Sequence, residues 1–209
     1  MNKEIFERLL QDKQYKAIKS IFDTLNPVDI AELFPELDEK DMVILFRLIP
    51  KERAAEVFTY LGQEEEQVLL LALTDTEIKG IMDDMFIDDA VDVIEEMPAN
   101  VVERMLALSG EKRTAINTIL NYPEDSAGSI MTLEYISLLP SMTIGDALKK
   151  VKSAGIRSET VYTCYVVEKH KLLGIITAKD LLTCDDSEKI SDVMETNIIS
   201  VKTHTDKEE

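Results

Sequence analysis

The side chains with the clearest chemical potential are the carboxylates between Asp75 and Met97. This stretch holds nine acidic residues and a single base, Lys79. Apolar residues recur between the acids with helical spacing, so Asp88 and Asp92, four positions apart, should project from the same face of a helix. Oxygen ligands without cysteine or histidine favour hard cations such as Mg2+ or Ca2+. We therefore predict that Asp88 and Asp92 are metal ligands.

The alternative is an acidic face that only water solvates. Each pair of like charges at this spacing costs a helix about 0.2–0.5 kcal/mol, which a bound cation would offset. The same choice applies to Asp83–Asp84 and to Glu64–Glu66, and for both we expect a solvated surface. The residues alone leave the choice open for Asp88 and Asp92.

Short helical units must position these carboxylates. A helix is expected over Met1–Phe22, with a break near Asp12–Lys13, and units of 12–13 residues follow it. Most units have Asn, Asp or Pro at or next to their start, which favours a helix start there. The first three units contain Leu-Phe-x-x-Leu, Leu-Phe-x-x-Ile and Val-Phe-x-x-Leu in turn. Helices this short need stacked neighbours, so the pattern predicts a superhelical, α-solenoid-like stack. The units are Leu25–Leu37, Asp38–Pro50, Lys51–Leu61, Gln63–Leu73, Asp75–Met85, Asp88–Met97 and Pro98–Leu108, with a last helix over Ser109–Leu120.

A polar joint, Glu124–Met131, precedes a stretch of different character. Strands alternating with helices indicate an α/β domain, so the fold class is α + α/β. The expected domains are residues 1–129, 130–195 and 196–209. Thr132–Leu139 should be strand-like or extended, and strands are expected over Thr160–Glu168, Leu172–Thr177 and Asn197–Lys202. The expected helices are Ile144–Ala154 with Thr143 as its cap, Ala178–Leu182 and Ile190–Met194.

Composition narrows the classes of function. The net charge is −18, of which −15 falls in residues 1–129. Such a surface repels nucleic acid and attracts cations or a basic partner, although charge of this kind also serves solubility alone. The longest apolar run, Val68–Leu73, is too short to span a bilayer, and no signal peptide is seen. We expect a cytosolic location, reduced thiols at Cys164 and Cys184, and no enzyme activity, because no catalytic constellation is present.

The second half resembles a CBS domain, a module that occurs in tandem and pairs face to face. The residues that carry this resemblance include Met142–Leu148, Tyr165–Val167 and Leu173–Leu182, the last reading Leu-Gly-Ile-Ile-Thr-Ala-Lys-Asp-Leu-Leu. Residues 194–209 resemble the start of a second CBS unit. With the acidic helical repeats and the joint motif Glu-Asp-Ser-Ala-Gly-Ser-Ile-Met-Thr-Leu-Glu-Tyr (Glu124–Tyr135), the whole chain resembles the cytosolic region of the MgtE family of magnesium transporters.

The resemblance implies a Mg2+ sensor on the cytoplasmic side of the cell membrane. It implies that Mg2+ ions bridge acidic residues of the helical domain and the CBS domains and hold a membrane pore shut, and that the protein is a homodimer through its CBS domains. By position in the family motifs, Asp88, Asp92, Gly128 and Asp206 correspond to metal-binding residues. Tyr162, Lys179 and Asp180 correspond to positions that contact a nucleotide, ATP in some members. The alternative is a soluble helical-repeat adaptor with a nucleotide-sensing CBS module.

Overall fold

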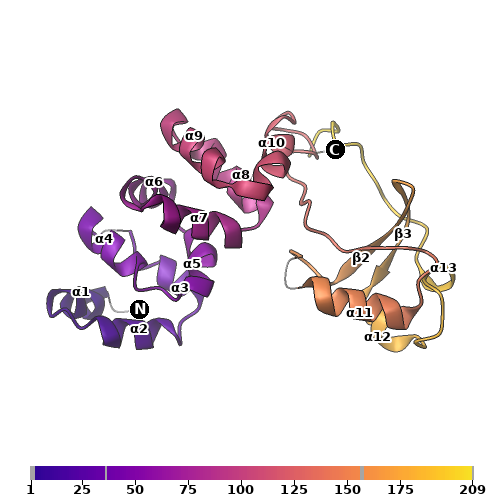
Figure 1. Cartoon of the computed structure of the whole chain (residues 1–209), viewed down its shortest axis with the longest axis horizontal. Helices are drawn as coiled ribbons and strands as arrows, with labels where there is room; N and C mark the ends of the chain where they lie inside the picture. The colour runs from indigo at the N-terminus through magenta and orange to yellow at the C-terminus, as the bar shows by residue number, and fades with distance from the viewer. Residues whose placement is uncertain (1–2, 36, 156–157, 209) are drawn as a thin grey trace. The chain divides into compact units, whose positions relative to one another are not determined.

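The structure is a computed structural model that describes residues 3–35, 37–155 and 158–208. Met1 and Asn2, at the start of the first expected helix, lie outside the described residues. The chain folds into two compact units, Met1–Leu120 and Asn121–Glu209. The first is helical and the second contains a small sheet (Figure 1).

Short helices build the helical unit, as the repeats predict. Their bounds are α1 (Lys3–Gln11), α2 (Tyr15–Phe22), α3 (Pro27–Ala31), α4 (Glu39–Phe46), α5 (Lys51–Phe58), α6 (Gln63–Ala72), α7 (Asp75–Asp84), α8 (Ile87–Glu96), α9 (Ala99–Leu108), the 3-10 turn η1 (Gly110–Lys112) and α10 (Arg113–Leu120). The expected break in the first helix is present, with Lys13 at a φ of 53°. The helix starts carry the expected signals, including Pro27, the Asp38 cap and a capping box at Thr74.

From α3 to α9, each helix packs on the next but one, which gives a two-row stack, and α1 packs on α2. The series α3, α5, α7 and α9 makes successive contacts, as does the series α4, α6 and α8, and α10 lies against α8. The phenylalanine of each early repeat lies at the centre of this packing. Phe34, Phe46 and Phe58 form consecutive edge-to-face pairs with ring centroids 6.3 and 5.9 Å apart. The period of 12 residues is therefore a packing period.

Long side chains from later helices satisfy the carbonyl groups at the ends of earlier ones. Arg104 donates to the carbonyl oxygens of Leu70 (2.7 Å) and Leu73 (2.8 Å) at the end of α6. Lys112 donates to the carbonyls of Asp83 and Met85 at the end of α7, and Arg53 donates to those of Phe22 and Leu25 at the end of α2. Because helix C-termini are partially negative, these cations stabilise them. These three bases are thus used on backbone groups.

A sheet with the order β1-β2-β3 forms the second unit. Strand β1 (Ser137–Leu138) runs parallel to β2 (Thr163–Glu168), which pairs antiparallel with β3 (Lys171–Thr177). Lys169 and His170 adopt positive φ in the turn between them. The helices are α11 (Ile144–Ala154), α12 (Ala178–Thr183) and α13 (Ile190–Val193), and Thr143 caps α11 as predicted. The core contains Ile136, Leu138, Ile144, Ala147, Cys164, Val166, Ile176, Leu181 and Ile190.

The segment Thr132–Leu139 is mostly extended chain, as expected, and Ser137–Leu138 within it forms β1. One strand prediction needs correction. The prediction of a strand over Asn197–Lys202 is wrong, because no described strand pairs with this segment and Ile199 is 99% exposed. A strand is stable only where a neighbour takes up its backbone hydrogen bonds, and local residue preference did not reveal whether one is present.

The joint belongs structurally with the second unit. The backbone N–H groups of Ala127 and Gly128 donate to the carbonyls of Thr205 (2.8 Å) and Thr203 (2.7 Å), and the N–H of Lys207 donates to the carbonyl of Asp125 (2.8 Å). The joint therefore lies in the unit Asn121–Glu209, and the domain boundary expected at residue 129 stays a prediction.

Candidate functional site

The acids of α7 are mostly engaged within the protein. Glu77 accepts hydrogen bonds from Arg47 at 2.7 and 3.1 Å, which lowers the pKa of its carboxyl to about 2. Asp75 pairs with Arg104 at 2.7 Å, and Asp83 pairs with Lys79 at 3.0 Å. Bases from α9, from the end of α4 and from α7 itself therefore fix three of the four carboxylates on this helix.

The acids of α8 are arranged differently. This helix contains Asp88, Asp89, Asp92, Glu95 and Glu96 and no base. Asp88 is half-buried in the first turn, where the positive end of the helix favours an acid. Within the part of the chain that the structure describes, Asp92 and Glu96 form no ion pair with a base. The prediction that α8 presents carboxylates four positions apart is confirmed, and whether they bind metal stays a prediction.

Asp92 lines a small pocket that we call the acidic pocket. Its volume is about 160 Å3, and it is lined by Thr59, Leu61, Glu66, Asp89, Asp92, Val93 and Glu96. Partial desolvation raises the pKa of the Asp92 carboxyl above its usual range. Four acidic residues, Glu66, Asp89, Asp92 and Glu96, therefore line one concavity, and partial desolvation disfavours the charged forms of Glu66 and Asp92.

Glu66 corrects one sequence prediction. Glu64 is exposed and Glu65 is half-buried, but Glu66 is only 5% exposed, so the expectation of a solvated Glu64–Glu66 face is wrong at this position. Burial, reinforced by the negative charges of Glu96 and Glu65, raises the pKa of Glu66 to about 7. The helical repeat contained a signal for this, since Glu66 lies three and four positions before the buried Leu69 and Leu70 and so shares their face of α6. Asp83 and Asp84 are exposed, as expected.

Gly128 and Asp206 lie on adjacent segments of the second unit. The Gly128 N–H donates to the Thr203 carbonyl, as described above. Two residues earlier, Ser126 forms a β-bridge with Asp206. A Cβ atom at Gly128 would lie 2.6 Å from the Tyr122 ring and 2.8 Å from the Thr203 carbonyl oxygen, so only glycine fits this approach. The Asp206 side chain is exposed and accepts a bond from the N–H of Glu208. The backbone of this joint thus brings together two of the residues predicted to bind metal.

The predicted nucleotide residues meet at the start of α12. The N–H of Ala178 donates to the carbonyl of Tyr162 (2.9 Å), and the Tyr162 side chain is 78% exposed. Lys179 is also exposed. Asp180 accepts bonds from the Thr177 hydroxyl (2.5 Å) and N–H (3.1 Å), which lower the pKa of its carboxyl and complete a capping box. Asp180 therefore has a structural role in starting α12, whatever else it binds.

Within residues 3–35, 37–155 and 158–208, no three His, Cys, Asp or Glu side chains converge closely enough to hold a metal ion by themselves. The acidic residues described above suit a cation that keeps part of its water shell, as Mg2+ does. No helix among the described residues combines the length and apolar character that crossing a membrane requires.

The chain matches two protein families. Residues 25–125 match the MgtE intracellular N domain, and residues 127–186 match the CBS domain. Among relatives, the magnesium transporter MgtE of Thermus thermophilus is 30% identical over 97% of this chain, and that of Bacillus subtilis is 30% identical over 96%. These alignments include 46% and 45% of the two transporters, so the chain spans about half the length of the relatives it matches.

Two solved structures share the fold. One is the cytosolic domain of the Mg2+ channel MgtE in complex with ATP, with a TM-score of 0.90, 28% identity and coverage of 97% of this chain and 84% of that one. The other is the soluble part of a magnesium transporter, with a TM-score of 0.87, 26% identity and coverage of 99% and 82%. Both support the expected order of a helical domain followed by a CBS domain.

Proposed function

The chain belongs to the MgtE family through an intracellular N domain followed by a CBS domain, and from this we propose that it is a Mg2+-sensing regulatory region of a magnesium transporter. In the whole protein it lies on the cytoplasmic side of the membrane, beside the pore that it controls. Its role is regulatory and not enzymatic.

The observation that carries this proposal is a difference between two helices: bases pair with most acids of α7, whereas α8 contains no base. Asp88 and Asp92 lie on a helix without a base, and the pKa of Asp92 is raised by its surroundings. Carboxylates in such a setting repel any other acidic surface brought near them. A divalent cation between the two surfaces converts the repulsion into a bridge, so cation concentration biases domain closure through differential affinity.

The second unit supplies the other side of the proposed bridge. Asp206 and the backbone carbonyl of Gly128 are the ligands we assign there, because both lie at the joint held by residues 203–207. Among the described backbone N–H groups outside helices and strands, none donates to this carbonyl. A sensor of an abundant ion needs weak sites, and ligands divided between two units provide low affinity. At 100 times its dissociation constant, one such ion favours the closed state by about 2.7 kcal/mol.

Two further features belong to the same proposal. Tyr162, Lys179 and Asp180 form a nucleotide contact region at the start of α12, and a relative's cytosolic domain binds ATP. Homodimerisation through the CBS domains would place two sensors beside one pore.

A thermal melt and a small-angle scattering series in Mg2+, from submillimolar to tens of millimolar, test the proposal. Ionic strength is held constant with K+, so that general screening does not count as binding. The wild type is compared with the double variant Asp88→Ala/Asp92→Ala. The matched control is Asp83→Ala/Asp84→Ala, which removes the same two charges from α7.

We expect Mg2+ to raise the melting temperature and compact the wild type and the α7 control, and to act clearly less on the Asp88/Asp92 variant. Equal effects of Mg2+ and K+ would refute the sensor. An Asp88/Asp92 variant that responds like the wild type would refute these residues as ligands.

A further inference from the structure

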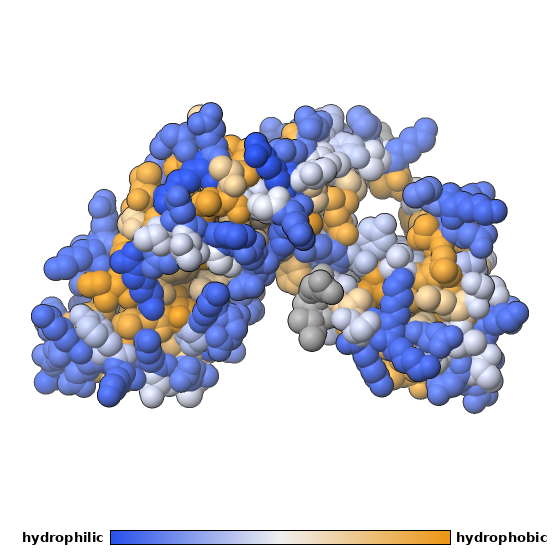
Figure 2. Space-filling view, in the orientation of Figure 1, coloured by the Kyte–Doolittle hydropathy of each residue, from blue (hydrophilic) through white to orange (hydrophobic). Residues whose placement is uncertain are grey.

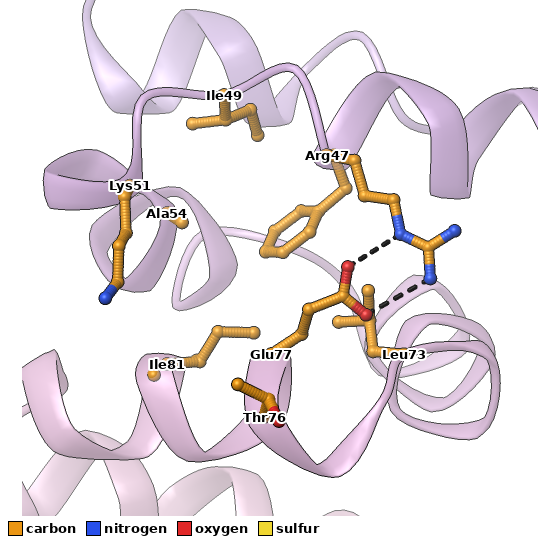
Figure 3. A pocket seen from close by; sticks show the side chains of 10 residues that line it. Arg47, Ile49, Lys51, Ala54, Leu73, Thr76, Glu77 and Ile81 are labelled. Atoms are coloured by element: carbon orange, nitrogen blue, oxygen red, sulfur yellow. Dashed lines mark hydrogen bonds and ion pairs between the residues drawn. The ribbon is translucent and has the colours of Figure 1, made fainter.

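A second concavity of the helical unit lies away from the acidic pocket. It has a volume of about 370 Å3 and lies between the turn after α4, the start of α5, and α7 (Figure 3). We call it the Lys51 pocket. Its lining residues are Phe46, Arg47, Ile49, Lys51, Ala54, Leu73, Thr76, Glu77, Gly80 and Ile81. An apolar wall with a few polar groups, at this volume, is typical of sites for small molecules.

The charges around the Lys51 pocket leave one cation in excess. Arg47 and Glu77 neutralise each other through two hydrogen bonds. Glu77 also accepts bonds from the Thr74 N–H (2.8 Å) and hydroxyl (2.9 Å). Lys51 lies on the opposite side of the pocket from this pair (Figure 3), and its ammonium group forms no hydrogen bond or ion pair with the residues that the structure describes. Among the lining residues, the Lys51 ammonium is therefore the charge that a bound anion would neutralise.

Two locally unfavourable residues meet at this place. Lys51 is the first residue of α5, where the positive end of the helix disfavours a cation. Gly80 is in the middle of α7, where glycine is less stable than alanine by about 1 kcal/mol.

Packing does not explain the glycine. A Cβ atom at Gly80 would meet only the Cε atom of Lys51, at an ordinary contact distance of 3.7 Å. Residues that break local rules without a structural need are expected at functional sites. The absent side chain keeps space open beside the lysine.

We propose that the Lys51 pocket binds an amphipathic carboxylate, a small molecule with one carboxylate group and an apolar body. The apolar body lies against Phe46, Ile49 and Ile81. The carboxylate group accepts hydrogen bonds from the Lys51 ammonium and offsets its unfavourable position at the start of α5. The polar and apolar parts of the ligand thus match the two kinds of surface in the pocket. Figure 2 shows that hydrophilic side chains surround hydrophobic patches on the visible face of the helical unit.

The test uses the whole chain, isotope-labelled on isoleucine methyl groups, in buffer with a chelator and without Mg2+. The absence of Mg2+ separates this result from that of the sensor experiment. Three probes are titrated below their micelle-forming concentrations. Decanoate has the head and the body, decyltrimethylammonium has the body with a cationic head, and acetate has the head alone. The variants are Lys51→Ala, Gly80→Leu and Gly80→Ala, with Lys19→Ala as a control on the exposed side of α2.

We expect decanoate to shift the methyl signals of Ile49 and Ile81 saturably, and the other two probes to leave them in place. Because Lys51 is exposed, Lys51→Ala should weaken decanoate binding about threefold, through loss of its ion pair with the carboxylate. Gly80→Leu should abolish binding by filling the space, and Lys19→Ala should not change it. Gly80→Ala should raise the melting temperature by about 2–4 °C, because alanine favours the helix. It should also weaken decanoate binding, so this variant still tests the proposal if Gly80→Leu does not fold.

Three results would overturn the proposal. One is the absence of any decanoate shift. Another is an equal response to decyltrimethylammonium, which would indicate unspecific apolar contact. The third is binding by Lys51→Ala that equals wild-type binding.

Discussion

Helices α7 and α8 are neighbours of equal length, and both are acidic, yet Asp92 on α8 differs from the paired acids of α7. On α7, Arg47 lowers the pKa of Glu77 to about 2, and Arg104 and Lys79 fix Asp75 and Asp83. On α8, the pKa of Asp92 is raised, and the adjoining Glu66 has a pKa of about 7. The first set of carboxylates stabilises the fold, whereas the second would be stabilised by a cation from outside.

This difference shows that the count of acids does not identify a cation site. What matters is where the bases are placed. Arg53, Arg104 and Lys112 are used at the C-terminal ends of helices, and Arg104 also pairs with α7. Among the described residues, none of these three bases forms an ion pair with Asp92 or Glu96. The predictions below test the two sides of this comparison.

The largest effect is expected on the α7 side, for Arg104→Met. The variant leaves the carbonyls of Leu70 and Leu73 without their donor and breaks the ion pair with Asp75. Because these groups are partly buried, we expect the free energy of unfolding to fall by about 2–3 kcal/mol. Urea denaturation measures this loss. Arg113→Met, at an exposed position at the start of α10, should stay within about 0.5 kcal/mol of the wild type.

A smaller effect, and one that depends on pH, is expected for Glu66→Gln beside α8. The pKa of Glu66 is raised from 4.5 to about 7, so the folded protein holds this proton more tightly than the unfolded chain does. The free energy of unfolding therefore falls as pH rises between these two values, and stays low above them. The variant lacks the titrating group, so near pH 8 it should be more stable than the wild type by about 2 kcal/mol.

Denaturation of the wild type and Glu66→Gln on both sides of this pH range provides the measurement. The gain should disappear near pH 4, because both proteins then have a neutral side chain at residue 66. Glu64→Gln is the control, because Glu64 lies two residues before Glu66 on the exposed face of α6. This variant should show no such gain. A Glu66→Gln variant that follows the wild type at every pH would show that Glu66 is ionised at no cost, against the account given for the acidic pocket.

The smallest of the three effects is expected for Glu77→Gln on α7. The pKa of Glu77 is lowered from 4.5 to about 2, so its contribution to stability is complete above 4.5 and is lost as pH falls towards 2. The ion pair with Arg47 is partly open to solvent, and we expect a loss of about 1 kcal/mol at neutral pH. Thermal melts at neutral and acid pH measure it, with Asp84→Asn as the control. If Glu77→Gln and Asp84→Asn lose equal stability at neutral pH, the ion pair does not distinguish α7 from a solvated surface.

Sequence predicted the repeats well, because their phenylalanines and helix caps are local signals. The Phe34, Phe46 and Phe58 series packs as a repeat should, and α11 begins at its predicted cap, Thr143. Sequence failed where the outcome depends on a distant neighbour. Ile199 and Val201 are residue types that favour strands, but both are exposed and form no strand. Glu66, in a run of three acids, was expected at the surface but is buried. Pairing of α7 acids with Arg47 and Arg104 was likewise invisible, because each pair joins residues about 30 positions apart.

The most direct test of the account uses Mn2+ as a paramagnetic stand-in for Mg2+, added far below one equivalent to the labelled chain. Backbone signals around the bound ion broaden first. We predict that residues of α8 around Asp88 and Asp92 broaden before those around Asp75 and Asp83 on α7, and that excess Mg2+ reverses the broadening. Equal broadening of both helices, or broadening that Mg2+ does not reverse, would contradict the claim that α8, and not α7, presents carboxylates to a cation.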